Sequence, residues 1–295
     1  MRSLLFVPGD SDSKLAKALA AGADALILDL EDSVVAANKE AARWTTAGFL
    51  AQHRNLSERP KLYVRINSLD TVYWEDDLAA VMDAGPDGLV IPKAKSGDDV
   101  HQLSMALDLA EARAGHTHGV TRLVVLTTEV PAALLAMAGF IGASPRIEAL
   151  TWGAEDLSVA LGASASRDRH GHLTSPYRLA RDLCLITAAA GGMTAIDTVY
   201  TNFRDLDGLA AEAIEAARDG FSGKLAIHPA QIAPINVAFT PSRVEIERAE
   251  EIVALFADAG EQGVIALDGE MLDAPHLARA ERILERAKLA GALGR

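Results

Sequence analysis

Short apolar runs, each followed by a segment with helical spacing, recur along this chain. The runs lack polar alternation, as expected of parallel strands that are buried on both faces. We predict eight such strands, over residues 4–7, 25–30, 62–66, 88–91, 123–126, 149–152, 195–199 and 225–227. Residues typical of helix ends lie between these strands. Ser11 can cap the N-terminus of the first helix and Gly22 can end it, and Gly115 ends a helix predicted over 99–114.

Eight alternations of strand and helix favour a closed barrel over an open doubly wound sheet. Neither a GxGxxG nor a GxxxxGK[ST] motif follows a predicted strand, which weakens nucleotide-binding alternatives. We therefore predict an α/β fold, a (β/α)8 TIM barrel catalytic domain over residues 1–240, with a C-terminal helical extension over residues 241–295.

Within the extension we predict helices over 242–259 and 274–293, flanking an irregular segment over 264–273. An extension that follows a complete barrel can pack on another subunit. We therefore expect it to contact a neighbouring copy of the chain.

Composition narrows the class of protein. The 295 residues are 49% hydrophobic and 23% charged, which is typical of a globular protein. The formal net charge of −13 argues against nucleic-acid or anionic-membrane binding. The apolar run at the N-terminus is too short for a signal peptide, and no run approaches a membrane span, so we expect a cytoplasmic protein. Cys184 is alone and is interpreted as a small buried hydrophobic residue.

Candidate chemistry follows from the barrel, because active sites lie at the C-terminal ends of the strands. Ionisable residues follow most of the predicted strands, and carboxylates dominate. They are Asp29, Glu31, Asp32, Arg65, Lys93, Glu129, Glu155, Asp156, Asp197 and His228. A carboxylate-rich site suits a hard divalent cation.

Glu129 and Asp156 follow neighbouring strands and could together hold Mg²⁺, which commonly takes one or two protein carboxylates with water and substrate. The alternative is that each carboxylate merely caps the helix that follows it. The spacing leaves both interpretations open.

Asp29, Glu31 and Asp32 repel one another unless a cation compensates, and Arg65 on the next strand is a natural counter-charge. An arginine is also the usual group for gripping a substrate carboxylate. The pattern leaves a structural ion pair and substrate binding both open.

Lys93 could form a Schiff base with a keto substrate, or could simply pair with an acid or contact the ligand. His228 and His170 lack a visible triad partner or a second metal ligand, and no GxSxG motif supports a serine hydrolase.

Several of these stretches resemble the citrate-lyase-β-like branch of the HpcH/HpaI aldolase/citrate lyase superfamily, which includes malyl-CoA and citramalyl-CoA lyases. The similar segments run in order along nearly the whole chain: LFVPGD at 5–10, ALILDLEDSV at 25–34, VRIN at 64–67, GAEDL at 153–157, AIDTVY at 195–200, KLAIHPAQ at 224–231 and DGEMLDAPH at 268–276.

The resemblance implies a barrel that forms homotrimers or hexamers and binds Mg²⁺, with Mn²⁺ as an alternative, through Glu129 and Asp156. It implies that Arg65 grips the substrate and that Asp273 transfers a proton in the neighbouring subunit's site. Asp29, Glu31 and Asp32 would hold metal-bound water, with Asp32 counted among the catalytic residues.

The implied reaction is cleavage or formation of a 3-hydroxyacyl-CoA such as malyl-CoA or citramalyl-CoA, giving acetyl-CoA and a 2-oxo acid. Pro92 and Lys93 would contact the substrate, of which coenzyme A is a part. Arg2, Lys14 and Lys17, near the first barrel turn, are candidates for binding the CoA phosphates.

Two positions depart from the family pattern. Val130 follows Glu129 where a threonine is frequent, and Lys95 stands where an acid is frequent after Pro-Lys. Lys95 changes the local charge by two units, which leaves the substrate open. The alternatives are a β subunit of a citrate lyase complex acting on an acyl-carrier protein, a malyl-CoA thioesterase or synthase, and a metal aldolase for free hydroxy-oxo acids.

Overall fold

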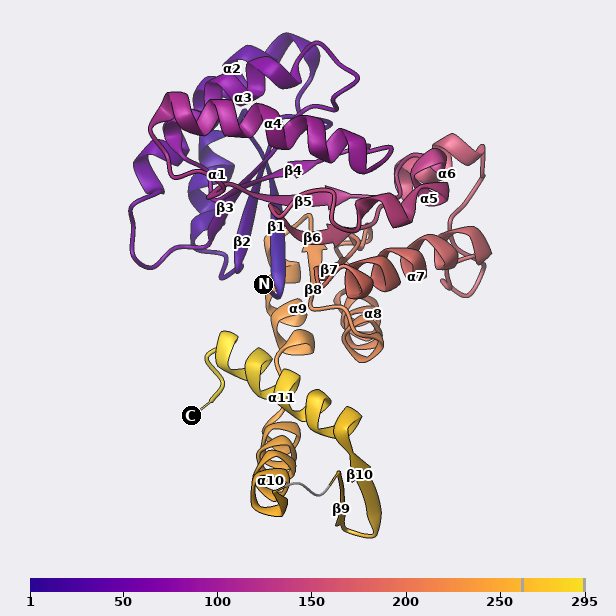
Figure 1. The fold of residues 1–295 in the computed structure, drawn as a ribbon. Helices are drawn as coiled ribbons and strands as arrows, with labels where there is room; N and C mark the ends of the chain where they lie inside the picture. Colours follow the sequence, from indigo (N-terminus) through magenta and orange to yellow (C-terminus); the bar gives the residue numbers. More distant parts are fainter. Residues whose placement is uncertain (261–262, 294–295) are drawn as a thin grey trace.

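The computed structural model describes residues 1–260 and 263–293, and its first eight strands form a closed parallel barrel (Figure 1). Each strand pairs with its neighbours in chain order, and β8 closes the barrel on β1. The strands are β1 (Ser3–Pro8), β2 (Ala25–Asp29), β3 (Lys61–Arg65), β4 (Gly88–Ile91), β5 (Arg122–Leu126), β6 (Ile147–Thr151), β7 (Thr194–Asp197) and β8 (Gly223–Ala226). The predicted (β/α)8 barrel is confirmed, with strand ends that differ by a few residues at most.

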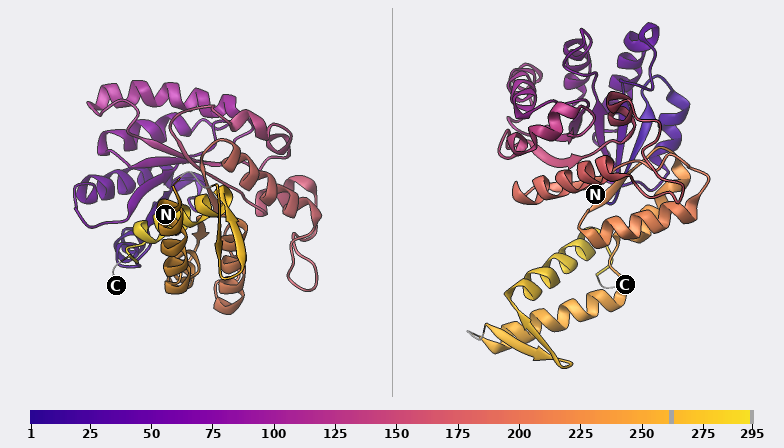
Figure 2. Two further views of the ribbon diagram at one scale, coloured as in Figure 1. Left: turned by 60° about the horizontal axis from the view of Figure 1, so that its bottom comes forward. Right: turned by 90° about the vertical axis from the view of Figure 1, so that its right-hand side faces the viewer.

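Helices surround the strands (Figures 1 and 2). They are α1 (Asp12–Leu19), α2 (Lys39–His53), α3 (Trp74–Val81), α4 (Gly97–Ala114), α5 (Pro131–Leu135), α6 (Glu155–Leu161), α7 (Ser175–Ala190), α8 (Leu206–Asp219) and α9 (Ile232–Phe239). Short 3-10 turns lie at Ala36–Asn38, Met82–Ala84, Met137–Phe140 and Pro229–Gln231. In the described ranges, no helix combines the length and apolar character that a membrane span requires.

Side chains alternate across the strands and thereby divide the core in two. One cluster fills the barrel interior and includes Leu4, Ile27 and Tyr63, while the larger cluster packs between the strands and the helices. Because successive residues of a strand point to opposite faces, residues two positions further along these strands also face inward. This parity places Phe6, Asp29 and Arg65 at the C-terminal mouth of the barrel.

The extension comprises α10 (Arg243–Ala259), a two-stranded antiparallel hairpin and α11 (Ala274–Leu289). The prediction of an irregular segment over 264–273 is wrong, because β9 (Val264–Leu267) and β10 (Glu270–Asp273) pair across a turn at Asp268 and Gly269, both with positive φ. Asp-Gly is the preferred sequence of such tight hairpin turns. Both figures show the extension projecting away from the barrel.

A buried ion-pair network ties the strands that carry the site's carboxylates to α4. Both guanidinium Nη atoms of Arg146, just before β6, lie 2.7 Å from the carboxylate oxygens of Glu111 on α4. Glu111 also accepts the N–H of Thr121, just before β5, at 2.9 Å. Burial by itself would raise the pKa of Glu111, but the bonds from Arg146 and the backbone outweigh it and hold that pKa at about 2.

Glu111→Gln is therefore expected to lower the free energy of unfolding by about 3 kcal/mol, because it leaves the buried Arg146 without its main partner. The folded-state pKa lies below the unfolded value, so this stabilisation is complete above about pH 4.5 and is lost as pH falls toward 2. Urea unfolding of both proteins between pH 2.5 and 7 measures the difference.

The matched control is Asp108→Asn, which removes the half-exposed partner of Arg146 and should change stability by less than about 1 kcal/mol. A Glu111→Gln difference that stays constant down to pH 2.5 would contradict the network's role.

Candidate active site

A cavity of about 340 Å³ opens at the C-terminal ends of the barrel strands. Its walls combine carboxylates with an apolar surface. The lining residues are Phe6, Pro8, Asp29, Asp32, Ser33, Arg65, Leu126, Glu129, Trp152, Gly153, Ala154, Glu155, Asp156, Thr198, Val199, Leu225 and Ile227. The cavity therefore offers charge on one part of its wall and apolar surface on another.

Arg65 is held rigidly at the floor of this cavity. Its Nε and Nη2 donate to the two carboxylate oxygens of Asp29, both at 2.7 Å, and Nη1 lies 2.9 Å from Glu31. The guanidinium carbon also lies 4.7 Å from the centre of the Phe6 ring, a stacking contact that adds to the ion pair. Burial acts against the charged form, yet these partners raise the pKa of Arg65 and lower that of Asp29.

The structural ion pair between Asp29 and Arg65 is present. Arg65 also lines the cavity, so its position is compatible with substrate binding as well. Phe6 had no independent signal in the sequence as a site residue. The feature that could have identified it is its position two residues after Leu4 on β1, which turns its side chain toward the barrel interior.

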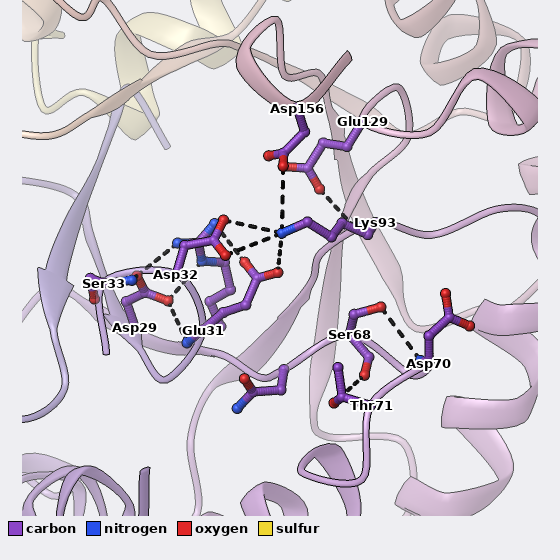
Figure 3. A network of polar contacts seen from close by, with 12 residues as sticks. Asp29, Glu31, Asp32, Ser33, Ser68, Asp70, Thr71, Lys93, Glu129 and Asp156 are labelled. Carbon is purple, nitrogen blue, oxygen red and sulfur yellow. Dashed lines mark hydrogen bonds and ion pairs between the residues drawn. The ribbon is translucent and has the colours of Figure 1, made fainter. Parts of the chain in front are cut away.

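Lys93, after β4, lies among the remaining carboxylates (Figure 3). Its Nζ is 2.5 Å from Glu31, 3.1 Å from Asp32 and 3.7 Å from Asp156. Its backbone N–H donates to Glu129 Oε2 at 2.6 Å. Burial opposes the charge of Lys93, but the bonds to Glu31 and Asp32 raise its pKa. These ion pairs favour the interpretation of Lys93 as the partner of acidic groups over a Schiff-base role.

Neither Glu129 nor Asp156 caps a helix. The N-cap residue of α5 is Val130 and that of α6 is Ala154, and neither helix end has a side-chain cap bond. Instead, Figure 3 shows the two carboxyl groups side by side, beyond Lys93. The capping interpretation is therefore wrong.

Glu129 is only 6% exposed. Burial, reinforced by the negative charges of Glu31 and Asp156, raises the pKa of Glu129 to about 8. A buried carboxyl beside a second carboxylate gains most from a nearby cation. Among the residues that line the cavity, Arg65 is basic, whereas Asp29, Asp32, Glu129, Glu155 and Asp156 are acidic.

These donors fit a magnesium ion. Over residues 1–260 and 263–293, no group of three or more His, Cys, Asp or Glu side chains is arranged to enclose a metal by itself. A pair of carboxylates that opens into a cavity is the arrangement Mg²⁺ uses when water or substrate completes its shell.

Thr128, directly before Glu129, and Gly153, three residues before Asp156, help to position these carboxylates. Neither residue was predicted from the sequence to belong to the site. The Thr128 hydroxyl accepts the Gly153 N–H at 3.0 Å and thereby joins the ends of β5 and β6. A Cβ built on Gly153 would lie 3.1 Å from Glu129 Cγ, so a larger residue there would force the Glu129 side chain to shift by a few tenths of an ångström. Glycine before an acidic pair was the available signal.

The three candidates for binding CoA phosphates lie at two different ends of the barrel. Lys14 and Lys17 are exposed on α1, the helix that follows the C-terminal end of β1. Arg2 precedes β1 at the opposite end of the barrel, where its Nη2 pairs with Asp24 at 2.7 Å. The structure therefore does not bring Arg2 to the mouth, because β1 runs the length of the barrel between them.

Asp273 also lies away from this chain's own cavity. It caps α11 in the extension, is exposed, and its carboxylate contacts His276 Nδ1 at 2.6 Å. Pro92 is buried next to Lys93 at the end of β4.

The expectation that Asp197 belongs to the strand-end site is wrong. Ile196 faces the barrel interior, so Asp197 points outward, where it pairs with Lys224 at 2.6 Å and accepts Trp152 Nε1–H at 2.7 Å. His228 accepts the Ala230 N–H in a turn. Cys184 is buried, in line with its interpretation as a small hydrophobic residue, and burial raises the pKa of its thiol to about 12.

Together, the parallel barrel and a carboxylate-rich cavity at its C-terminal mouth define a barrel enzyme of the aldolase and lyase type. The sequence specifies the family: residues 2–229 match HpcH/HpaI aldolase/citrate lyase, and the chain belongs to this family of carbon–carbon lyases.

Relatives carry more than one named activity. The chain is 36% identical to a (3S)-malyl-CoA thioesterase of Cereibacter sphaeroides, over 99% of this chain and 96% of the relative. It is 32% identical to citrate lyase subunit beta of Leuconostoc mesenteroides subsp. cremoris, over 97% and 93%. The crystal structure of CitE from Mycobacterium tuberculosis in complex with magnesium, acetoacetate and coenzyme A superposes with a TM-score of 0.77, at 34% identity over 97% and 98% of the two chains.

Proposed function

We propose that this chain is a Mg²⁺-dependent lyase that cleaves, or in reverse forms, a 3-hydroxyacyl-CoA such as malyl-CoA or citramalyl-CoA. The observation that carries the proposal is the pairing of the buried Glu129 with Asp156 at a cavity that also contains the fixed cation Arg65. The relative with bound magnesium and coenzyme A supports the same assignment.

Glu129 and Asp156 would hold the metal, with Mn²⁺ able to replace Mg²⁺. When bound, the ion would supply Lewis-acid stabilisation of the oxygen that becomes the carbonyl of the 2-oxo acid. Asp29, Glu31 and Asp32 would orient water around the ion, and Asp32, which is half exposed at the cavity, is our candidate for accepting the substrate's hydroxyl proton.

The substrate would be oriented by the two cations of the mouth. Arg65, fixed by Asp29, would face the carboxylate or thioester oxygen, while Lys93 and Pro92 would border the acyl group. The apolar wall of Phe6, Leu126 and Val199 fits the carbon chain. Lys14 and Lys17 would bind CoA phosphates.

Loss of the hydroxyl proton forms the carbonyl, the adjacent C–C bond breaks, and its electron pair passes to the thioester as an enolate. The enolate carbon then needs a proton. We assign that proton to Asp273 of a neighbouring subunit, because the residue is exposed on an extension that projects from its own barrel (Figure 2). This assignment requires an oligomer, which we propose to be a homotrimer or a hexamer.

A second candidate is hydrolysis of the thioester, alone or after condensation, which the malyl-CoA thioesterase relative favours. A β subunit that acts on an acyl-carrier protein and an aldolase for free acids are the remaining alternatives.

Product analysis separates these functions. The purified chain, with Mg²⁺ and either malyl-CoA or citramalyl-CoA, is expected to release a 2-oxo acid and intact acetyl-CoA without free thiol. Free CoA thiol released with malate would instead identify a thioesterase. No turnover of any CoA ester would redirect attention to a carrier-protein substrate or free acids.

A further inference from the structure

Lys93 has an unusual backbone for its residue type. Its φ of 51° lies in the left-handed region, which is unfavourable for a residue other than glycine. In the part of the barrel that the structure describes, no other non-glycine residue has a positive φ, since Asp268 lies in the hairpin turn of the extension. Strained backbone of this kind concentrates at functional sites.

In this left-handed conformation, Lys93 contacts carboxylates through both its backbone and its side chain. The backbone N–H points to the buried Glu129, while the ammonium group reaches Glu31, Asp32 and Asp156 (Figure 3). The closest of these contacts is to Glu31, and the longest, 3.7 Å, is to Asp156.

Arg65 cannot replace Lys93 as the counter-charge of Asp156. Its guanidinium nitrogens are already directed at Asp29 and Glu31. Lys93 is therefore the cation that faces Asp32 and Asp156, and it shares Asp156 with the ion we assign to that residue.

We propose that Lys93 is a positioning residue that competes with the divalent cation for Asp156 and so sets the affinity of the site for metal. Two cations around one carboxylate repel each other, so binding of the ion requires the ammonium group to retreat toward Glu31 and Asp32. Its backbone N–H still holds Glu129 in either position. This inference rests on the proposed metal site and adds to it a residue that limits occupancy.

Lys95 provides the matched control. It lies two residues further on and carries the same charge, but its ammonium group is exposed and pairs with Asp70 at 2.7 Å. Lys95→Met therefore removes the same charge from the same loop without touching Glu129 or Asp156.

The test is calorimetric titration of the EDTA-stripped full-length protein with MgCl₂ alone. Lys93→Met is expected to bind Mg²⁺ about tenfold more tightly than the wild type, because removal of a competing cation a few ångströms away is worth at least a factor of this size. Lys93→Arg keeps the charge and should stay within about threefold of the wild type, and Lys95→Met within about twofold.

Thermal unfolding of the same proteins, stripped and with saturating MgCl₂, provides the second measurement. The stripped Lys93→Met protein should melt below the wild type, and Mg²⁺ should raise its midpoint by more than it raises the wild type's. Lys93→Gly removes the ammonium group and also accommodates the positive φ, so it separates a folding defect from the charge effect.

An affinity of Lys93→Met and Lys93→Gly equal to or weaker than that of the wild type would overturn the inference while leaving the metal site intact. If Lys93 had only a structural role, Lys93→Met would lower the melting midpoints of the stripped and the Mg²⁺-saturated protein equally, and this result would also overturn the inference. Wild-type protein that binds no Mg²⁺ would overturn the proposed metal site and the inference together.

Discussion

Asp156→Asn is expected to reduce 2-oxo acid release from the CoA substrate by at least about a thousandfold, the loss of roughly 4 kcal/mol of transition-state stabilisation. The substitution preserves shape but leaves Glu129 as the only carboxylate of the pair. Since Asp156 is partly exposed and caps no helix, the fold should survive, and thermal unfolding of the stripped protein should be little changed.

The control for this substitution is Asp207→Asn, the same chemical change at an exposed position in the first turn of α8. It should retain wild-type activity. Turnover by Asp156→Asn within about tenfold of the wild type, at saturating Mg²⁺, would contradict the assignment of Asp156 as a metal ligand.

Asp273→Asn is expected to lower turnover by about a hundredfold or more, because general acid–base groups contribute on that scale. The stronger test is complementation. Co-expressed Asp273→Asn and Asp156→Asn chains should regain activity at about one quarter of the sites, where an intact mouth meets an intact neighbouring Asp273 in a ring of subunits.

Glu270→Gln, on the same hairpin as Asp273, is the matched control and should be active. Absence of any recovery in the mixed oligomer would show that Asp273 does not act across a subunit boundary. Full activity of Asp273→Asn by itself would remove the residue from the mechanism.

Much of the barrel could be predicted from the sequence because each strand is a short apolar run with helix signals on both sides. The candidate site residues could then be predicted because active sites of such barrels lie at the C-terminal ends of the strands. Asp29, Glu31, Asp32, Arg65, Lys93, Glu129 and Asp156 all converge at one mouth, as that geometry requires. Arg2 was misplaced because it precedes the strand instead of following it.

The remaining features depend on relations that a one-dimensional pattern does not contain. Asp197 was predicted to be a site residue because it lies at the C-terminal end of β7. Side chains alternate along the strand, however, and that of Asp197 points outward to Lys224. The position of the Lys93 ammonium group depends on one left-handed backbone angle. The hairpin over Val264–Leu267 and Glu270–Asp273 was missed although its Asp268-Gly269 turn is a local signal, because the helices on either side dominated the pattern.

A Mg²⁺ titration of the EDTA-stripped wild-type chain, with malyl-CoA as substrate and with glyoxylate and acetyl-CoA followed together, tests whether the protein is a Mg²⁺-dependent lyase. The stripped protein should form no glyoxylate, and added Mg²⁺ should restore activity saturably, with the two products in equal amounts. Glyoxylate formation that is unaffected by stripping, or CoA release without glyoxylate at every Mg²⁺ concentration, would contradict this function.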